Sequence, residues 1–335
     1  MRRSALVIVN PASGGGQTGR DWSGHERTIR AAGLDCDCVL TQSPGQATGL
    51  ARDAVREGRP LVVAAGGDGT MNEVVNGFFD GRERIASPTR FGILPLGTGG
   101  DFRRSAGVPT RLRAAASALA AALRDGVYRP LDLGRVTYAT DSGRELRHFL
   151  NVSDAGIGGE VASLVNRGPR LPHGSLTFLV ASLRALASWR NVPMRIDLDG
   201  EPRREVCQQV VVANAQYYGG GMRIAPLASW SDGLFDVVIV GDVGLKVNLL
   251  GLRRIRRGTH LQGLSPKISW LRARRVDIDS PSPVRIDVDG EQLGRLPATF
   301  EILPSALELA GSRPEAESGA GPEAAAAAPP AHGAR

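Results

Sequence analysis

Lysine is almost absent from this chain. Of its 41 basic residues only two are lysines, Lys246 and Lys267, and both lie in the last third of the sequence. A GxxxxGK[ST] phosphate-binding loop is therefore excluded from the first two thirds of the chain, as is any other phosphate site there that depends on lysine. Phosphate groups bound in that part must be held by backbone amides, hydroxyl groups, arginine or a metal ion.

Cysteine and long apolar runs are also scarce. The three cysteines, Cys36, Cys38 and Cys207, are an odd number without an export signal, which predicts free thiols in a reducing cytoplasm. No further metal ligands lie near Cys36 and Cys38 in the sequence, so we expect these two cysteines to be small core residues rather than part of a metal site. The first apolar run stops at Asn10-Pro11, which predicts a buried strand rather than a signal peptide, and no run is long enough to span a bilayer.

Positive charge is concentrated in one segment. The formal net charge is +7, but residues 243–276 alone contain nine basic and no acidic side chains. The rest of the chain is therefore slightly negative, which argues against a generally basic, nucleic-acid-binding protein. Apolar residues alternate with these cations, so the segment 246–275 is expected to contact an anionic membrane surface. A solvated basic face or a nucleic-acid patch is the alternative.

The predicted secondary-structure pattern changes near residue 130. Residues 1–130 alternate strand and helix patterns, which predicts an α/β domain with a parallel sheet. Residues 131–297 contain short β-rich runs separated by turn residues, which predicts an antiparallel sandwich-like or barrel-like domain interrupted by two helical segments. Residues 311–335 have almost no apolar bulk beyond alanine, and we expect a disordered tail.

One glycine-rich loop has the residue pattern of a phosphate-binding site. In VVAAGGDGTMNEVVNG, residues 62–77, a strand pattern ends in Gly66 and Gly67, and a helix pattern follows Asp68. Glycines let the backbone approach a ligand closely, and a helix N-terminus binds phosphate. A carboxylate beside phosphate requires a cation between them, so the loop predicts a triphosphate site with Mg²⁺ near Asp68 and a phosphate contact from Thr70. In the alternative, Asp68 only caps the helix.

Two other glycine-rich loops also follow predicted strands. NPASGGG, residues 10–16, leaves the first strand, and PLGTGGDF, residues 95–102, leaves the fourth. All three loops should meet at the carboxyl edge of one parallel sheet, where such folds bind ligands. The match of residues 14–19 to GxGxxG does not indicate a dinucleotide fold, because Asn10-Pro11 separates the strand from the glycines.

Together with YYGGGMRIAPLASWSDGLFDVVIV, residues 217–240, these motifs resemble the bacterial lipid kinases of the diacylglycerol kinase catalytic-domain family, distant relatives of NAD kinases. The likeness covers nearly all of residues 1–304. It implies an α/β nucleotide-binding domain and a β-rich domain, with the active site in the cleft between them. It also implies that a last strand, at about residues 298–310, returns to the first domain.

The resemblance implies roles for individual residues. Those expected to contact ATP are Asn10, Pro11, Ala12, Ser13, Gly14, Thr41, Gly67, Asp68, Gly69, Thr70, Met71, Asn72, Glu73 and Thr98. Those expected at metals are Asp232 with the carbonyls of Ser229 and Leu234 at a structural Mg²⁺, and Asp68, Asp101 and Asp132 around the nucleotide metal and its water network. By pattern alone, Asp132 and Asp232 would be turn residues. One departure is Gly100, where the family usually has Asn.

The general base has two candidates in the pattern. RIDLDGE ends at Glu201 and RIDVDGE ends at Glu291, each at a predicted hairpin. The spacing is the same in both, so pattern alone does not separate them. The resemblance favours Glu291, and Asp68 is expected to act with it in catalysis.

The leading hypothesis is an ATP- and Mg²⁺-dependent lipid kinase in the cytoplasm, bound peripherally to the inner face of the membrane. It leaves open which lipid hydroxyl is phosphorylated and whether the chain forms a homodimer, and no nucleic-acid partner is expected. The alternatives are an NAD kinase-type kinase of a soluble substrate and a catalytically silent nucleotide- or lipid-binding regulator. The first leaves the basic segment unexplained, and retention of Asp68 and Glu291 argues against the second.

Overall fold

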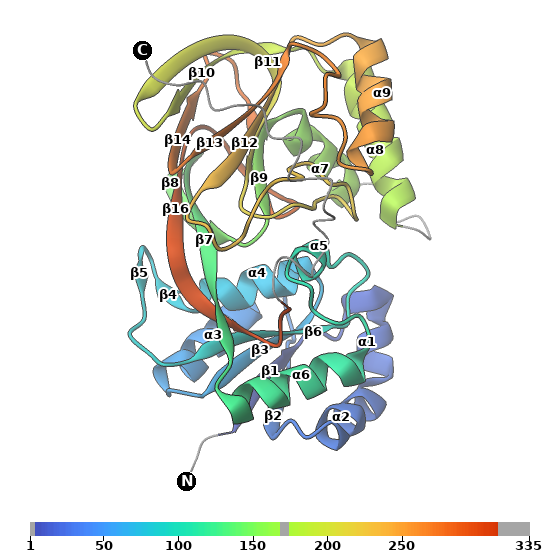
Figure 1. The fold of residues 1–335 in the computed structure, drawn as a ribbon, viewed down its shortest axis with the longest axis vertical. Helices are drawn as coiled ribbons and strands as arrows, with labels where there is room; N and C mark the ends of the chain where they lie inside the picture. The colour runs from blue at the N-terminus through green and yellow to red at the C-terminus, as the bar shows by residue number, and fades with distance from the viewer. Residues whose placement is uncertain (1–3, 168–173, 314–335) are drawn as a thin grey trace.

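A computed structural model describes residues 4–167 and 174–313. Most of the predicted tail, from residue 314 onward, lies outside the described residues. Figure 1 shows two units stacked along the long axis of the molecule, an α/β unit below and a β-rich unit above. The two-part organisation with a β-rich second part, predicted from the sequence, is confirmed.

Parallel strands form the sheet of the N-terminal unit. Its strand order is β2-β1-β3-β6, and each neighbouring pair is parallel. The strands are β1 (Ala5–Val9), β2 (Cys36–Leu40), β3 (Leu61–Gly66) and β6 (Arg90–Pro95). The helices and the short 3₁₀ turn are η1 (Ser13–Gly16), α1 (Gln17–Arg20), α2 (Trp22–Ala31), α3 (Gln46–Arg56), α4 (Asp68–Asn76), α5 (Asp101–Ser105) and α6 (Leu112–Asp125).

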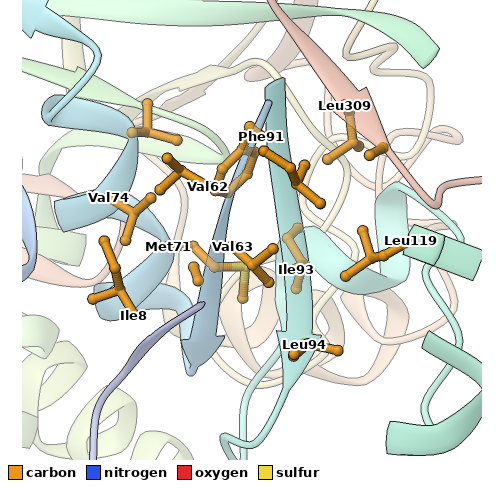
Figure 2. Close-up of a cluster of buried hydrophobic side chains, with 14 of the residues drawn as sticks. Ile8, Val62, Val63, Met71, Val74, Phe91, Ile93, Leu94, Leu119 and Leu309 are labelled. Atoms are coloured by element: carbon orange, nitrogen blue, oxygen red, sulfur yellow. The ribbon is translucent and has the colours of Figure 1, made fainter. Parts of the chain in front are cut away.

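Apolar side chains on both faces of this sheet explain its place between helices. Every residue of β3 is buried, as a strand covered on both faces requires. Figure 2 shows Val63 of β3 and Ile93 of β6 among Met71 of α4, Leu119 of α6 and Leu309 of the last strand. Each such side chain contributes about 1.5–3 kcal/mol by leaving water, so the sheet is a rigid base for the loops at its edge.

Two helices differ from the sequence expectation. The pattern of residues 18–33 predicts one helix, but the helix is broken at Asp21 into α1 and α2. The pattern of residues 69–80 predicts a helix through FFD, but α4 ends at Asn76. Part of that segment forms a small hairpin instead, made of β4 (Phe79–Asp80) and β5 (Glu83–Arg84).

The second unit is built from antiparallel strands that close on themselves. The pairing runs β16-β15-β9-β11-β10-β14 and returns to β16, with β12 and β13 extending from β11 and β8 from β7. A buried apolar cluster fills the interior. The shorter strands are β8 (Gly143–Phe149), β9 (Val152–Gly156), β10 (Val192–Leu198), β11 (Glu201–Ala213), β12 (Phe235–Gly241), β13 (Ile268–Ala273), β14 (Arg275–Asp279) and β15 (Arg285–Val288).

Two long strands pass through both units. These are β7 (Tyr128–Thr140) and β16 (Glu291–Ala310), which pair with each other along most of their length (Figure 1). The end of β16 also pairs in parallel with β6, so it returns to the first sheet. The domain boundaries predicted at residues 130 and 298 therefore fall inside continuous strands.

Three helices accompany the β-rich unit. They are α7 (Ile157–Arg167), α8 (Gly174–Ser188) and α9 (Leu245–Ile255). Within residues 4–167 and 174–313, no helix combines the length and the apolar composition needed to cross a bilayer.

Candidate active site

The three glycine-rich loops converge where β1, β3 and β6 end. Asn10 Nδ2 donates to Thr70 Oγ1 at 3.1 Å, which joins the first loop to the second. Thr18 Oγ1 donates to the Leu96 carbonyl at 2.9 Å, which joins the first loop to the third. Close packing makes glycine necessary at this edge: a Cβ at Gly97 would lie 2.4 Å from Gly67 Cα.

A small pocket lies between the first two loops. Its volume is about 190 Å³, and among the residues expected to contact ATP it is lined by Asn10, Pro11, Ala12, Thr41, Thr70 and Glu73. Glu73 is held in place because its Oε2 accepts the Ala47 amide at 3.1 Å. The side chain of Met71, another residue expected to contact ATP, is buried in the core of the N-terminal unit.

Asp68 connects two loops. Its carboxylate accepts the Gly100 amide at 2.8 Å and the Phe102 amide at 3.4 Å, so it caps the short helix α5. The carboxylate nevertheless also lines a large cavity, together with Thr98 and Asp101. Gly100 has φ +68, a left-handed conformation that Asn adopts more readily than other side chains, so the loop geometry does not depend on the family's Asn.

Asp101 is a buried acid next to this loop. It accepts the Gly220 amide at 2.8 Å and pairs with Arg104 at 2.7 Å. Burial and the nearby charge of Asp68 raise the pKa of Asp101 to about 6. Two carboxylates whose charges repel at the cavity wall form the environment in which a bound cation is stabilising.

The RIDVDGE hairpin reaches the phosphate loops from the other unit. Oε1 of Glu291 would lie 3.6 Å from a Cβ on Gly69. Arg147 approaches the Glu291 carboxylate at 3.8 Å. Burial raises the pKa of Glu291, and Arg147 opposes that rise. A carboxylate placed this way accepts a proton more readily than an exposed glutamate does.

Asp289 fixes that hairpin to the rest of the site. It is partly buried and accepts the amides of Leu150, Asn151 and Val152 at 2.9–3.1 Å. It also accepts Asn72 Nδ2 of α4 at 2.8 Å, which ties the hairpin to the helix after the GGDGT loop. Asn72 therefore connects the two units, whereas the resemblance implied a contact with ATP.

Two arginines at the cleft were missed by sequence reasoning. Arg104 lines the large cavity beside Asp101, and Arg147 lies between Glu291 and Asn72, where its Nε donates to Asn72 Oδ1 at 2.8 Å. The near-absence of lysine was the available signal, since it leaves arginine as the main cationic side chain for an anionic ligand.

Glu201 lies apart from this arrangement. It is exposed on the β10–β11 hairpin, whose Asp199 accepts amides of Arg274 and Arg275 instead of groups at the cleft.

The resemblance implies a structural Mg²⁺ at Asp232 and the carbonyls of Ser229 and Leu234. Asp232 is paired with Arg272 and accepts the Leu234 amide at 3.1 Å. Across the described residues, no cluster of three or more acidic, His or Cys side chains is arranged to hold a metal. Asp132 also has partners within the protein, because its two oxygens accept the Gly233 and Ser305 amides at 2.6 Å. Asp132 of β7 is thus tied to Ser305 of β16.

The large cavity extends from the loops into the β-rich unit. Its volume is about 590 Å³. One end is polar and includes Asp68, Asp101 and Asp289. The other end is apolar and lies between α7 and α9, with the lining residues Ile157, Val161, Val247, Leu252, Ile255, Leu264 and Ile268.

Helix α9 lies on the outer side of the β-rich unit (Figure 1), and several of its residues line the cavity. Leu252 and Ile255 line the cavity. Leu245, Leu249 and Leu250 are instead 42–63 % exposed. Three cations of the basic segment are paired with acids: Lys267, Arg272 and Arg275. Six form no ion pair with any residue that the structure describes: Lys246, Arg253, Arg254, Arg256, Arg257 and Arg274.

Comparisons with known proteins agree with this arrangement. The diacylglycerol kinase catalytic domain matches residues 4–136, and the YegS C-terminal NAD kinase beta sandwich-like domain matches residues 151–311. The chain is 30% identical over 306 residues to a diacylglycerol kinase of Mycobacterium tuberculosis, covering 90% of this chain and 93% of the relative. It is 29% identical over 305 residues to one of Bacillus subtilis, covering 90% and 94%.

Solved structures show the same fold. A diacylglycerol kinase of Bacillus anthracis, 22% identical, has a TM-score of 0.68 and covers 93% of this chain and 97% of that one. Yeast NADH kinase, solved with NADH and 11% identical, has a TM-score of 0.51 and covers 94% and 85%. The two matched domains and the full-length relatives show that the chain belongs to the bacterial diacylglycerol kinase family.

Proposed function

We propose that this chain is an ATP-dependent lipid kinase that transfers the γ-phosphoryl group to a hydroxyl of a lipid. The observation that carries the proposal is the 590 Å³ cavity, which has carboxylates at one end and an apolar chamber at the other. A cavity of this size with a few convergent polar groups is typical of small-molecule sites. A soluble nucleotide substrate would leave the apolar end unused.

The residues of the cleft fit the parts that phosphoryl transfer requires. The pocket at Asn10 and Thr41 accommodates the nucleotide, and the glycine loops bring backbone amides to its phosphates. Asp68 and Asp101 are the residues that would hold a nucleotide-bound Mg²⁺, which usually needs only one or two carboxylates besides phosphate oxygens. The metal would neutralise charge on the phosphates.

Glu291 is placed to relieve the substrate hydroxyl of its proton. It faces the Gly69 loop across the cleft, and its raised pKa favours proton uptake. The hydroxyl would lie between Glu291 and the phosphates, with the acyl chains toward α7 and α9. Arg104 and Arg147 supply the positive charge that lysine does not.

The basic surface of α9 is the proposed membrane contact. Basic residues near an anionic leaflet contribute about 1 kcal/mol each, so four that face it give about 4 kcal/mol. The exposed Leu245, Leu249 and Leu250 add apolar contact. We expect cosedimentation with anionic but not zwitterionic vesicles, lost at high salt. Equal binding to both kinds of vesicle contradicts this part of the proposal.

The test of the function uses labelled ATP, Mg²⁺ and a total lipid extract. Label should enter the organic phase with the wild-type protein and should not with Asp68→Asn, which removes a carboxylate from the proposed metal site. A parallel reaction with NAD tests the soluble-substrate alternative. Label in NAD but not in lipid overturns the proposal, and label in neither favours a catalytically silent binding protein.

A further inference from the structure

Two buried carboxyl groups lie on the cavity wall and have no role in the reaction described above. Asp154 on β9 and Asp287 on β15 are direct partners across the two strands, so their side chains project from the same face. Both line the cavity, and they are only 1% and 5% exposed. Asp154 Oδ1 and Asp287 Oδ2 have no hydrogen-bond partner among the described residues.

Three more unpartnered atoms lie on the same cavity. They are Asn151 Oδ1, Gln208 Oε1 and His260 Nδ1, each from a side chain that is more than nine-tenths buried. His260 Nε2 carries the proton because it donates to the Ile224 carbonyl at 2.9 Å. Burial lowers the pKa of His260 to about 4, so the ring is neutral and Nδ1 is an acceptor. Asn151 Oδ1, Gln208 Oε1 and His260 Nδ1 are therefore acceptors, as is any oxygen of the two carboxyl groups that carries no proton.

Buried acceptors without partners are unfavourable unless something donates to them. Burial raises the pKa of Asp154 to about 7, and burial together with the charge of Asp154 raises that of Asp287. Repulsion between two facing carboxylates favours retention of one proton by the pair. Acceptor oxygens remain whichever carboxyl group holds it, so a ligand group here must bring its own donors.

The Asp154–Asp287 pair is connected through the chain to Glu291, the proposed base for the reacting hydroxyl. Asp287 and Glu291 belong to one hairpin, whose turn is closed by the Gly290 amide donating to Asp287 Oδ1 at 3.1 Å. The apolar chamber also begins at β9, because Ile157 and Gly158 follow that strand directly and line the cavity. The chain therefore connects the pair directly to the proposed base and to apolar residues of the cavity, so the polar head of a lipid bound there would meet it.

We propose that Asp154 and Asp287 recognise a second hydrogen-bond donor, a hydroxyl or an ammonium group, next to the lipid hydroxyl that is phosphorylated. This inference rests on the proposed lipid-kinase function and narrows its substrate class. A diacylglycerol head offers one hydroxyl and two ester groups that only accept. A lipid head with a vicinal diol or an amino alcohol offers the additional donor.

Matched lipids test this directly. The substrates are a 1-O-alkylglycerol, its 2-O-methyl ether, which keeps the chain and removes one donor, and its 2-amino analogue, which distinguishes a hydroxyl from an ammonium. We expect wild-type kcat/KM to fall by about tenfold or more when the second donor is methylated. The preference is the ratio of kcat/KM for the diol to kcat/KM for its methyl ether. Asp154→Asn and Asp287→Asn should each reduce this preference by a similar factor. Asp197→Asn, the equivalent change in the RIDLDGE hairpin, should preserve it.

The outcomes separate the inference from the function. If wild type phosphorylates none of the lipids, and none in the total extract, the proposed function itself fails. If it phosphorylates the diol and its ether equally, or if both variants lose activity on both lipids in equal proportion, the function stands and the donor subsite is wrong. A changed Mg²⁺ requirement with unchanged lipid preference identifies a cation site and also overturns the inference. Circular dichroism checks that each variant folds. If a carboxyl variant does not fold, Gln208→Leu is tested in its place, and it should also lose the preference for the diol over its methyl ether.

Discussion

The molecule contains the same seven-residue hairpin pattern twice, at residues 195–201 and 285–291. The two turns have the same local geometry. The Gly200 amide donates to Asp197 Oδ1 at 2.8 Å, and the Gly290 amide donates to Asp287 Oδ1 at 3.1 Å. Asp199 and Asp289 both have positive φ, 53 and 49. The local sequence therefore determines the turn in both places.

The surroundings of the two hairpins differ. Asp199 accepts two backbone amides at the surface, whereas Asp289 is partly buried, accepts three amides of buried residues and binds Asn72 of the other unit. Glu201 is exposed, and burial raises the pKa of Glu291. The short motif therefore determines the backbone conformation of both hairpins. Contacts with residues distant in the sequence determine that only the second hairpin has a glutamate with a raised pKa at the cleft.

The largest expected difference is in catalysis. Glu291→Gln should lower turnover on the lipid substrate by about 10²-fold or more, because the hydroxyl loses its proton acceptor. ATP affinity should change little, since the nucleotide pocket is lined by other residues. Glu201→Gln is the matched control and should be nearly silent. Steady-state kinetics on one lipid checks both, and the opposite ranking would move the active site to the other hairpin.

Stability gives the second contrast. Asp289→Ala leaves three buried amides and one side-chain amide without their acceptor, so it should cost about 3 kcal/mol in the free energy of unfolding. Asp199→Ala exposes its two amides to water and should cost about 1 kcal/mol. Urea unfolding measures both values. Equal losses would contradict the assignment of Asp289 as the anchor of the cleft.

Glycine substitution should show what the hairpins share. Gly200 and Gly290 have φ of 94 and 88, and a Cβ added at either position would meet no atom within 4 Å. Alanine at either position therefore costs only backbone strain, about 1 kcal/mol in each case. We expect equal shifts in the urea midpoint but reduced lipid turnover only for Gly290→Ala. A reduction in turnover by both variants would argue against a local effect on Glu291.

The smallest expected effect is on pH dependence. Arg147 lowers the pKa of Glu291, and burial raises it. The base acts as a carboxylate, so kcat/KM falls as the pH drops through this pKa. Arg147→Gln should move that acidic limb to higher pH, whereas Arg203→Gln on the first hairpin should leave it in place. A pH–rate profile that does not move in Arg147→Gln would show that another group sets the acidic limb.

The sequence predicted what depends on short segments. The glycine loops and their meeting at one sheet edge follow from strand–loop–helix patterns around residues 10, 67 and 97. It could not predict that Asn72 turns to Asp289, since 217 positions separate them. Asp232 is similar: its pairing with Arg272 depends on the approach of β13, which no local pattern records.

The basic segment shows the same limit. Residues 245–258, one of the two helical segments predicted in the second part, include α9. The pattern does not say what the apolar face covers, and in the structure Leu252 and Ile255 face a cavity. A hollow inside the β-rich unit is created by the closure of strands far apart in the chain, so it leaves no periodic signal.

The return of β16 to the first sheet has a consequence during protein synthesis. The N-terminal unit is translated first, but its sheet ends at β6 until residues 307–310 are made, after the whole β-rich unit. The part encoded first is therefore completed last. In that interval the free edge of β6 is open to pairing with other chains, a hazard of unpaired strands in folding intermediates. A chain that stops at Leu303 would keep nearly every residue of the second unit and yet leave the first unit unfinished.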